Sequence, residues 1–167
     1  MAYAQDLLEQ AKHLALRETG RPRRASLRRS VSAAYYALFH LLVADAVKRF
    51  CPPFPKELQF RWHRSFVHND MLQACKGFAN ANPPENLTAL LSVPLPPEIV
   101  AVATAFVSLQ QERHYADYDL GRTISRQDAL NQIEKADNAF RAWKNIRQTQ
   151  SADVFLSALL LGKHWSR

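Results

Sequence analysis

The central segment of the chain, residues 26–50, reads SLRRSVSAAYYALFHLLVADAVKRF and contains neither glycine nor proline. On a helical wheel of about 100° per residue, it forms an apolar stripe made of Leu27, Val31, Ala34, Leu38, Leu41 and Leu42. The opposite side is not simply polar, because Tyr36, Val43 and Val47 lie there beside Arg29 and His40. A helix that is apolar on two sides is buried on two sides. We therefore expect it to be the central helix of an all-α domain.

The second apolar side of this helix needs a cover. A second copy of the chain is the simplest one, so we expect a homodimer with Tyr36 and His40 at the dimer surface or in a cleft beside it. The alternative is that a short helix near the C-terminus covers this side within one chain. The segment 31–47 is slightly short for a membrane span and contains His40 and Asp45, which predicts a buried helix and no membrane anchor.

Periodicity and proline positions predict the remaining elements. Helices are expected at about 3–18, 56–78, 97–118 and 125–148, and a short one at 151–161. Residues 125–128 resemble a capping box. The segment 80–97 contains Pro83, Pro84, Pro94, Pro96 and Pro97 and is expected to be a surface crossover rather than a helix. The fold prediction is an up-and-down bundle of about five main helices in one domain, 1–167, with 151–167 as a C-terminal extension.

Composition limits the partners and the chemistry. The 167 residues fit one domain, and 22 Lys and Arg against 15 Asp and Glu give a net charge of +7, which favours polyanionic partners. Two cysteines without repeated spacing and an N-terminus without the pattern of a secretory signal predict a cytoplasmic protein. No glycine-rich phosphate loop or Cys-x-x-Cys pair occurs, and His63 and His68 do not share a helix face. We therefore expect no cofactor and no metal site.

The densest positive charge lies in the loop before the central helix and in its first turns, at Arg17, Arg21, Arg23, Arg24, Arg28 and Arg29. Cations near a helix N-terminus oppose the helix dipole, whereas a bound phosphate would be stabilised by the dipole and the guanidinium groups together. Arg21, Arg23, Arg24, Arg28 and Arg29 are therefore candidates for nucleic-acid binding. The alternative is a solvated loop whose charges are screened.

Polar residues extend the apolar stripe of the predicted helix 97–118. After Leu109 the stripe continues into Gln110, Arg113 and Asp117. Arg113 and Asp117 are four residues apart and therefore neighbours on a helix, and Asp45 on the central helix is a further possible partner for Arg113. The pair is either a structural ion pair or part of a binding or catalytic cleft.

Two blocks resemble the HEPN domains of prokaryotes. Residues 29–40, RSVSAAYYALFH, resemble their helix with paired tyrosines, and residues 113–118, RHYADY, resemble the Arg-x-x-x-Asp-Tyr version of their signature; the helix containing Ala129, Ala136 and Phe140 follows. The resemblance covers about residues 4–145. It implies a helical bundle that dimerises, binds RNA or nucleotides, often acts as a ribonuclease toxin of a toxin–antitoxin system, and is frequently encoded with a nucleotidyltransferase-like partner.

The resemblance also assigns candidate catalytic residues: Arg113, Asp117 and Tyr118. Nuclease members carry a histidine four to six residues after the arginine, where this chain has Tyr118, Asp119 and Leu120. A second arginine-to-histidine spacing, Arg61 to His68, places its two side chains about 10 Å apart along the predicted helix 56–78. RNA or nucleotide binding is thus the leading hypothesis. The alternatives are a metal-independent ribonuclease that uses Arg113 with an unconventional base, or a non-catalytic protein-interaction module.

Overall fold

The computed structural model describes residues 2–52, 54–83, 85–91 and 94–165. Within these ranges the chain forms eight helices and no strand. The helices are α1 (Ala2–Leu16), α2 (Arg24–Phe50), α3 (Lys56–Ser65), α4 (His68–Ala79), α5 (Glu85–Thr88), α6 (Pro97–Tyr118), α7 (Arg126–Ile146) and α8 (Gln150–Trp165). The all-α prediction is confirmed. Pro84 in the crossover and both ends of the predicted domain, residues 1 and 166–167, lie outside the described residues.

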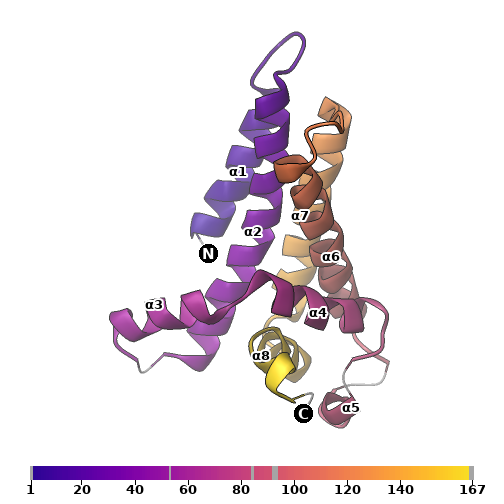
Figure 1. Cartoon of the computed structure of the whole chain (residues 1–167). Coiled ribbons are helices and arrows are strands. Elements are labelled where there is room, and N and C mark those ends of the chain that lie inside the picture. The colour runs from indigo at the N-terminus through magenta and orange to yellow at the C-terminus, as the bar shows by residue number, and fades with distance from the viewer. Residues whose placement is uncertain (1, 53, 84, 92–93, 166–167) are drawn as a thin grey trace.

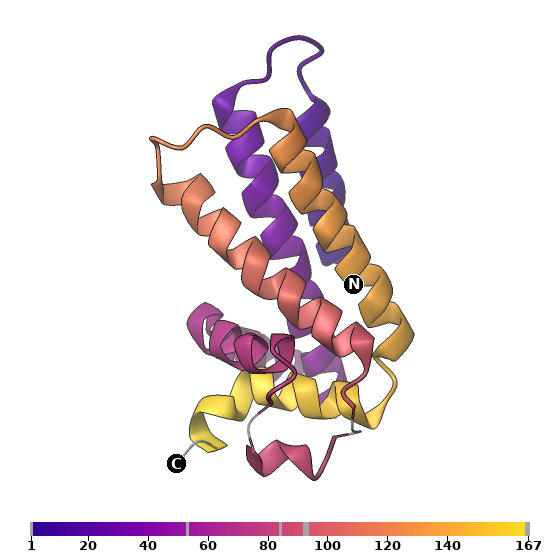
Figure 2. The same ribbon diagram turned by 90° about the vertical axis from the view of Figure 1, so that its right-hand side faces the viewer.

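Four long helices, α1, α2, α6 and α7, lie side by side, and α4 and α8 cross one end of them (Figures 1 and 2). The helix α2 is central, because it packs against α1, α6, α7 and α8. All residues of its predicted apolar stripe are buried. Its most apolar part is long enough to span a membrane, but 83% of that window is buried inside the bundle. The prediction of a buried central helix is confirmed.

The second side of α2 is covered partly within one chain. Val43 and Val47 are 1% and 4% exposed, so neither needs a second copy to leave water. Tyr36 and His40 remain half-buried. Of the residues predicted on this second side, Arg29, Tyr36 and His40 still reach solvent, whereas the two valines do not.

The predicted helix 56–78 is wrong as a single element. Phe66 and Val67 are extended, with φ −78°, ψ 114° and φ −102°, ψ 127°, and they separate α3 from α4. The break lets α4 turn across the bundle and bury Met71, Cys75 and Phe78 against α6 and α8. By contrast, α3 projects from the bundle and has no buried residue (Figure 1).

The region after α4 is more structured than predicted. The crossover 80–97 contains the short α5, and Pro83, Leu87 and Leu91 are buried, so it is not wholly a surface segment. The helix α8 is longer than the predicted 151–161. It packs against α4, with the Phe155 ring centroid 5.0 Å from that of Phe78.

The predicted capping box is confirmed, because Ser125 and Asp128 bond each other's backbone N–H at the start of α7.

A buried polar contact links the end of α7 to α2. Asp45 of α2 accepts a 2.8 Å hydrogen bond from Trp143 Nε1 and lies 3.6 Å from Arg147 Nη1. The prediction that Asp45 is a partner of Arg113 is therefore wrong. Asp45 lies about 20 Å along α2 from Ser32, the residue of α2 that bonds Asp117 beside Arg113.

Candidate functional site

Arg113 and Asp117 form the predicted ion pair near the end of α6. Arg113 Nε lies 2.8 Å from Asp117 Oδ2, and the two side chains are 20% and 21% exposed. Two residues of α2 complete the arrangement. Ser32 Oγ donates a 2.6 Å hydrogen bond to Asp117 Oδ1, and Arg113 Nη2 donates a 2.9 Å bond to the Tyr36 hydroxyl oxygen. The pair thus joins α6 to α2 and still reaches solvent.

Tyrosine rings surround the Arg113 guanidinium. Its Cζ atom lies 6.0, 5.5 and 5.7 Å from the ring centroids of Tyr35, Tyr36 and Tyr118. A guanidinium within about 6 Å of an aromatic ring is attracted by the ring's quadrupole. Tyr118 is 66% exposed and Tyr36 is half-buried, so two of these rings are accessible beside the cation.

His68 of α4 joins this cluster from a distant part of the sequence. Its Nδ1 shares a 2.6 Å hydrogen bond with the Tyr35 hydroxyl, and its ring centroid lies 4.2 Å from that of Phe39. The spacing of four to six residues between arginine and histidine in the HEPN signature does not identify His68. The expected shared helix for Arg61 and His68 was also wrong, since these residues lie on α3 and α4. No local pattern signals the contact, because the break between α3 and α4 creates it.

Burial perturbs the titration of this cluster. Burial lowers the pKa of His68, and the charge of Arg113 lowers it further. Burial also lowers the pKa of His40, with smaller contributions from His63 and His68. Burial raises the pKa of the Tyr35 hydroxyl, against the effect of Arg113. At neutral pH the histidines are thus held neutral and Tyr35 keeps its proton, which leaves Arg113 as the cation of the cluster.

His40 extends the aromatic surface towards α1. Its ring centroid is 6.3 Å from that of Tyr36 in a stacked arrangement and 5.0 Å from that of Tyr3. Arg29, Ala33, Tyr36 and His40 follow the i, i+4, i+7 and i+11 positions of one helix face. We call this the α2–α6 face: Arg29, Tyr36 and His40 of α2 together with Arg113, Asp117 and Tyr118 of α6.

The predicted arginine cluster divides into two groups. Arg28 is directed into the protein: its guanidinium donates to the backbone oxygens of Tyr115, Ala116, Asp119 and Arg122. Arg24 donates a 2.6 Å bond to Leu120 O. Tyr115 O and Asp119 O also accept from the backbone N–H groups of Asp119 and Arg122, so the two arginines add charged donors to the carbonyls at and just beyond the end of α6. Both residues therefore fasten the start of α2 to the end of α6.

The other predicted arginines face solvent. Arg21, Arg23 and Arg29 are exposed. Arg23 lies near Glu18, whose pKa is lowered mainly by a hydrogen bond from Ser26. Within the described part of the chain, Arg21 and Arg29 have neither a hydrogen bond nor an ion pair. Arg29 is thus the arginine of the cluster that shares a helix face with Tyr36 and His40.

Among the described residues, no group of three or more His, Cys, Asp or Glu side chains is arranged to hold a metal ion. Cys51 and Cys75 are buried free thiols, and burial raises the pKa of both. The chemistry that the described site offers is therefore that of a guanidinium, a carboxylate, neutral imidazoles and phenol rings.

Arg28→Ala is expected to destabilise the protein by about 2 kcal/mol, because it leaves the carbonyls at the end of α6 without their charged donor. The adjacent Arg29→Ala is the control, since its side chain is exposed without a partner, and it should change stability by no more than about 0.5 kcal/mol. Urea denaturation measures both. Equal losses in the two variants would contradict the capping role of Arg28.

Stability is expected to fall as the pH drops from 7.5 to 5.5. When the pKa of a histidine is lower in the native than in the unfolded state, the unfolded chain binds more protons than the native chain below about pH 6.5. Acid therefore favours unfolding. The carboxyl groups of Glu18 and Asp128 have lowered pKa values, so they change charge below the range of pH 7.5 to 5.5 and do not contribute to this loss. His68→Gln should lose less stability than the wild type between these pH values, as measured by denaturation midpoints. An unchanged pH dependence in His68→Gln would show that His68 is not held neutral.

Comparisons of the chain with protein-family models, with curated proteins and with solved structures found no match. What the protein does must therefore be inferred from the residues and their geometry.

Proposed function

We propose that the protein is a HEPN-like helical homodimer that binds RNA or nucleotides on its α2–α6 face. The observation that carries this proposal is the placement of Arg113 among accessible tyrosine rings, on the same surface as the unpaired Arg29. Cations beside accessible rings are the combination that single-stranded nucleic acids require.

The cations would contact phosphate groups. Arg29 has no partner within the described residues, so binding a phosphate would break no existing contact. Arg113 is oriented by Tyr36 and Asp117. Asp117 already accepts from Ser32 and faces the guanidinium, so its charge is compensated and does not repel an approaching anion strongly. The face therefore carries an excess of positive charge.

The rings would stack on bases. Tyr36 and His40 are half-buried and Tyr118 is exposed. A base that stacks on an aromatic side chain gains about 1–3 kcal/mol whatever its identity. Arg29 lies about 10 Å along α2 from Tyr36, so one strand could contact the cation and the ring together. The residues of the two HEPN-like blocks, Tyr36 and Arg113 with Asp117 and Tyr118, are in contact with one another, which supports the proposal.

The projecting helix α3 supports the homodimer. It has no buried residue, yet Phe60 is 65% and Leu58 37% exposed. It lies beside the α2–α6 face, because His63 of α3 is close enough to His40 to affect its pKa. Association of two copies through α3 would remove this apolar surface from water and would place two α2–α6 faces next to one seam.

A second candidate is a metal-independent ribonuclease. It is favoured by the neutral His68, which lies near enough to Arg113 for the guanidinium charge to lower its pKa. A neutral imidazole can accept a proton from a ribose hydroxyl, and a guanidinium can stabilise charge on the phosphate.

Arg29→Glu is expected to weaken binding of a fluorescent single-stranded RNA at least tenfold and to reduce the salt slope of log K by about one. Loss of a phosphate contact lowers counterion release, which is the source of that slope. Lys76→Glu, an exposed reversal on α4, is the control and should weaken binding less than threefold. Fluorescence anisotropy across a salt series measures both.

Equal losses in Arg29→Glu and Lys76→Glu would contradict a specific α2–α6 face, because they would indicate attraction by net charge alone. The RNA-binding reactions contain EDTA, so that no metal ion is available, and the RNA from each reaction is run on a gel to detect cleavage. Cleavage of the RNA that is lost in both Arg113→Ala and His68→Gln would identify the ribonuclease instead of the binding protein.

The wild type is expected to have the mass of a dimer in sedimentation equilibrium, and Phe60→Glu should shift it to the mass of a monomer. A buried unpaired carboxylate would oppose association, while Phe60 is exposed enough that the fold should not change. Leu16→Glu is the control, since Leu16 is 58% exposed at the end of α1. A monomeric wild type, or a dimer that Phe60→Glu does not affect, would contradict association through α3.

A further inference from the structure

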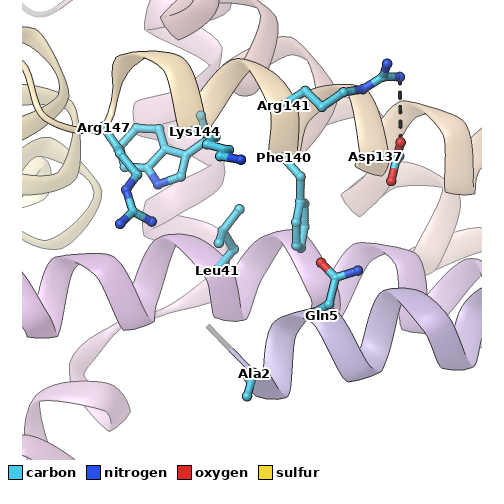
Figure 3. Close-up of a pocket in the computed structure, with 9 residues that line it drawn as sticks. Ala2, Gln5, Leu41, Asp137, Phe140, Arg141, Lys144 and Arg147 are labelled. Carbon is cyan, nitrogen blue, oxygen red and sulfur yellow. Dashed lines mark ion pairs between the residues drawn. The ribbon is translucent and has the colours of Figure 1, made fainter.

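A pocket of about 670 Å³ lies between α1 and α7, and it shares no lining residue with the α2–α6 face (Figure 3). Ala2, in the first described turn of α1, lines the pocket together with Leu41 of α2. The remaining wall comes from α7 (Arg126–Ile146) and from Arg147, which follows it.

The interior of the pocket is apolar. Leu41, Phe140 and Trp143 line it from α2 and α7, and Figure 3 shows Leu41 and Phe140 in the space between these two helices. The indole N–H of Trp143 is already bonded to Asp45. Among the described lining residues other than Trp143, Gln5 is the one uncharged polar side chain. The pocket thus offers contact area for an apolar body but few groups that could read the edge of a nucleobase.

The rim of the pocket is cationic. Arg141 and Lys144 of α7 and Arg147, which follows α7, line it, and Asp137 is the one carboxylate among the described lining residues. That carboxylate is occupied, because it lies 3.4 Å from Lys12 Nζ and 3.6 Å from Arg141 Nη2. Lys144 is exposed and has no hydrogen bond or ion pair within the described chain.

Two neighbouring features add to this positive potential. The first described turn of α1 contains no acidic residue, so no carboxylate of that turn offsets the positive end of the helix dipole. A smaller pocket of about 130 Å³ shares Arg147 and adds Lys48 and Arg49. Its Asp45 is bonded to Trp143 and Arg147, and Arg49 pairs with Asp153. Lys48 and Lys144 therefore remain as cations that form no ion pair with any residue the structure describes.

We propose that this pocket binds an amphipathic organic anion, an acyl or alkyl chain that ends in a carboxylate or a phosphate. The chain would lie against Phe140 and the small parts of Leu41 and Trp143 that reach the pocket, since these two side chains are 5% and 1% exposed. The anionic group would meet Lys144 and Arg147 at the rim. The volume falls within the range of about 300–1,000 Å³ that is usual for small-molecule sites. Neither the apolar interior nor the cationic rim alone specifies this ligand, but their juxtaposition does.

Trp143 provides the signal for a test, because it lines the pocket. Trp62→Phe and Trp165→Phe remove the other two of the three tryptophans, so that emission reports on Trp143 alone. Laurate and dodecyl phosphate, titrated below their micelle concentrations, represent the two headgroups. Dodecyltrimethylammonium supplies the same chain with the opposite charge, and acetate supplies the charge without the chain.

A saturable change of Trp143 emission is expected with laurate, with dodecyl phosphate or with both, and the tighter of the two identifies the headgroup. Acetate and dodecyltrimethylammonium should bind at least tenfold more weakly. The absence of a saturable change with both anions would overturn the proposal. Equal binding of dodecyltrimethylammonium would also overturn it, because the site would then be an apolar surface without charge selection.

Variants in the same background localise the binding. Lys144→Glu should weaken it at least tenfold, whereas Lys76→Glu, an equal charge change on α4, should alter it less than twofold. Gln5→Phe, a change at an exposed position that fills the pocket from its rim, should also weaken it at least tenfold. Equal effects of the two reversals, or no effect of Gln5→Phe, would overturn the assignment. Circular dichroism checks that each variant is folded.

Discussion

Enclosure of α2 by its neighbours is the constraint on which the rest of the structure depends. A helix of 27 residues buried on nearly every side must find a partner for each polar group that it takes out of water. Different helices supply these partners. Ser30 bonds Ala11 O of α1, Ser32 bonds Asp117 of α6, Tyr35 bonds His68 of α4, and Asp45 bonds Trp143 of α7. An axial slip of any neighbour along α2 would break such a bond, and the bonds of Ser30 and Asp45 are buried, so these contacts define the register of the bundle.

The same requirement builds the candidate site. Ser32 and Tyr36 fix Asp117 and Arg113 from α2, while Arg28, one turn earlier on α2, holds the carbonyls at the end of α6. The end of α6 is therefore attached to α2 at Arg113 and at several residues that follow it. A cation held in this way loses little conformational freedom when it binds an anion. An internal ion pair and a ligand site are thus compatible here, because the structural contacts occupy some donors of Arg113 and orient the rest.

Local sequence patterns predicted the parts of this structure that depend on neighbours in the chain. The apolar stripes, the Ser125 cap and the pair of Arg113 with Asp117 all follow from helical periodicity. The errors lie where tertiary packing decides. No glycine or proline marks the break at Phe66 and Val67, which exists because α4 must turn to bury its own apolar face. The position of His68 beside Tyr35 follows from that turn. Arg28 and Arg29 have identical chemistry and adjacent positions, yet a rotation of about 100° directs Arg28 into the end of α6 and leaves Arg29 in solvent.

The helix α1 connects the pocket beside α7 to the α2–α6 face. Ala4, Leu8, Ala11 and Ala15 bury its inner side, and most of them are small, so α1 packs closely on α2. Its first turn faces both sites: Ala2 and Gln5 line the pocket against α7, while the Tyr3 ring lies against His40. The ion pair of Lys12 with Asp137 is one contact that holds α1 to α7, and both side chains are well exposed. A ligand in the pocket would therefore contact the same helical turn that positions Tyr3 at the edge of the α2–α6 face. The first described turn of α1 thus borders both the pocket and the aromatic edge of that face.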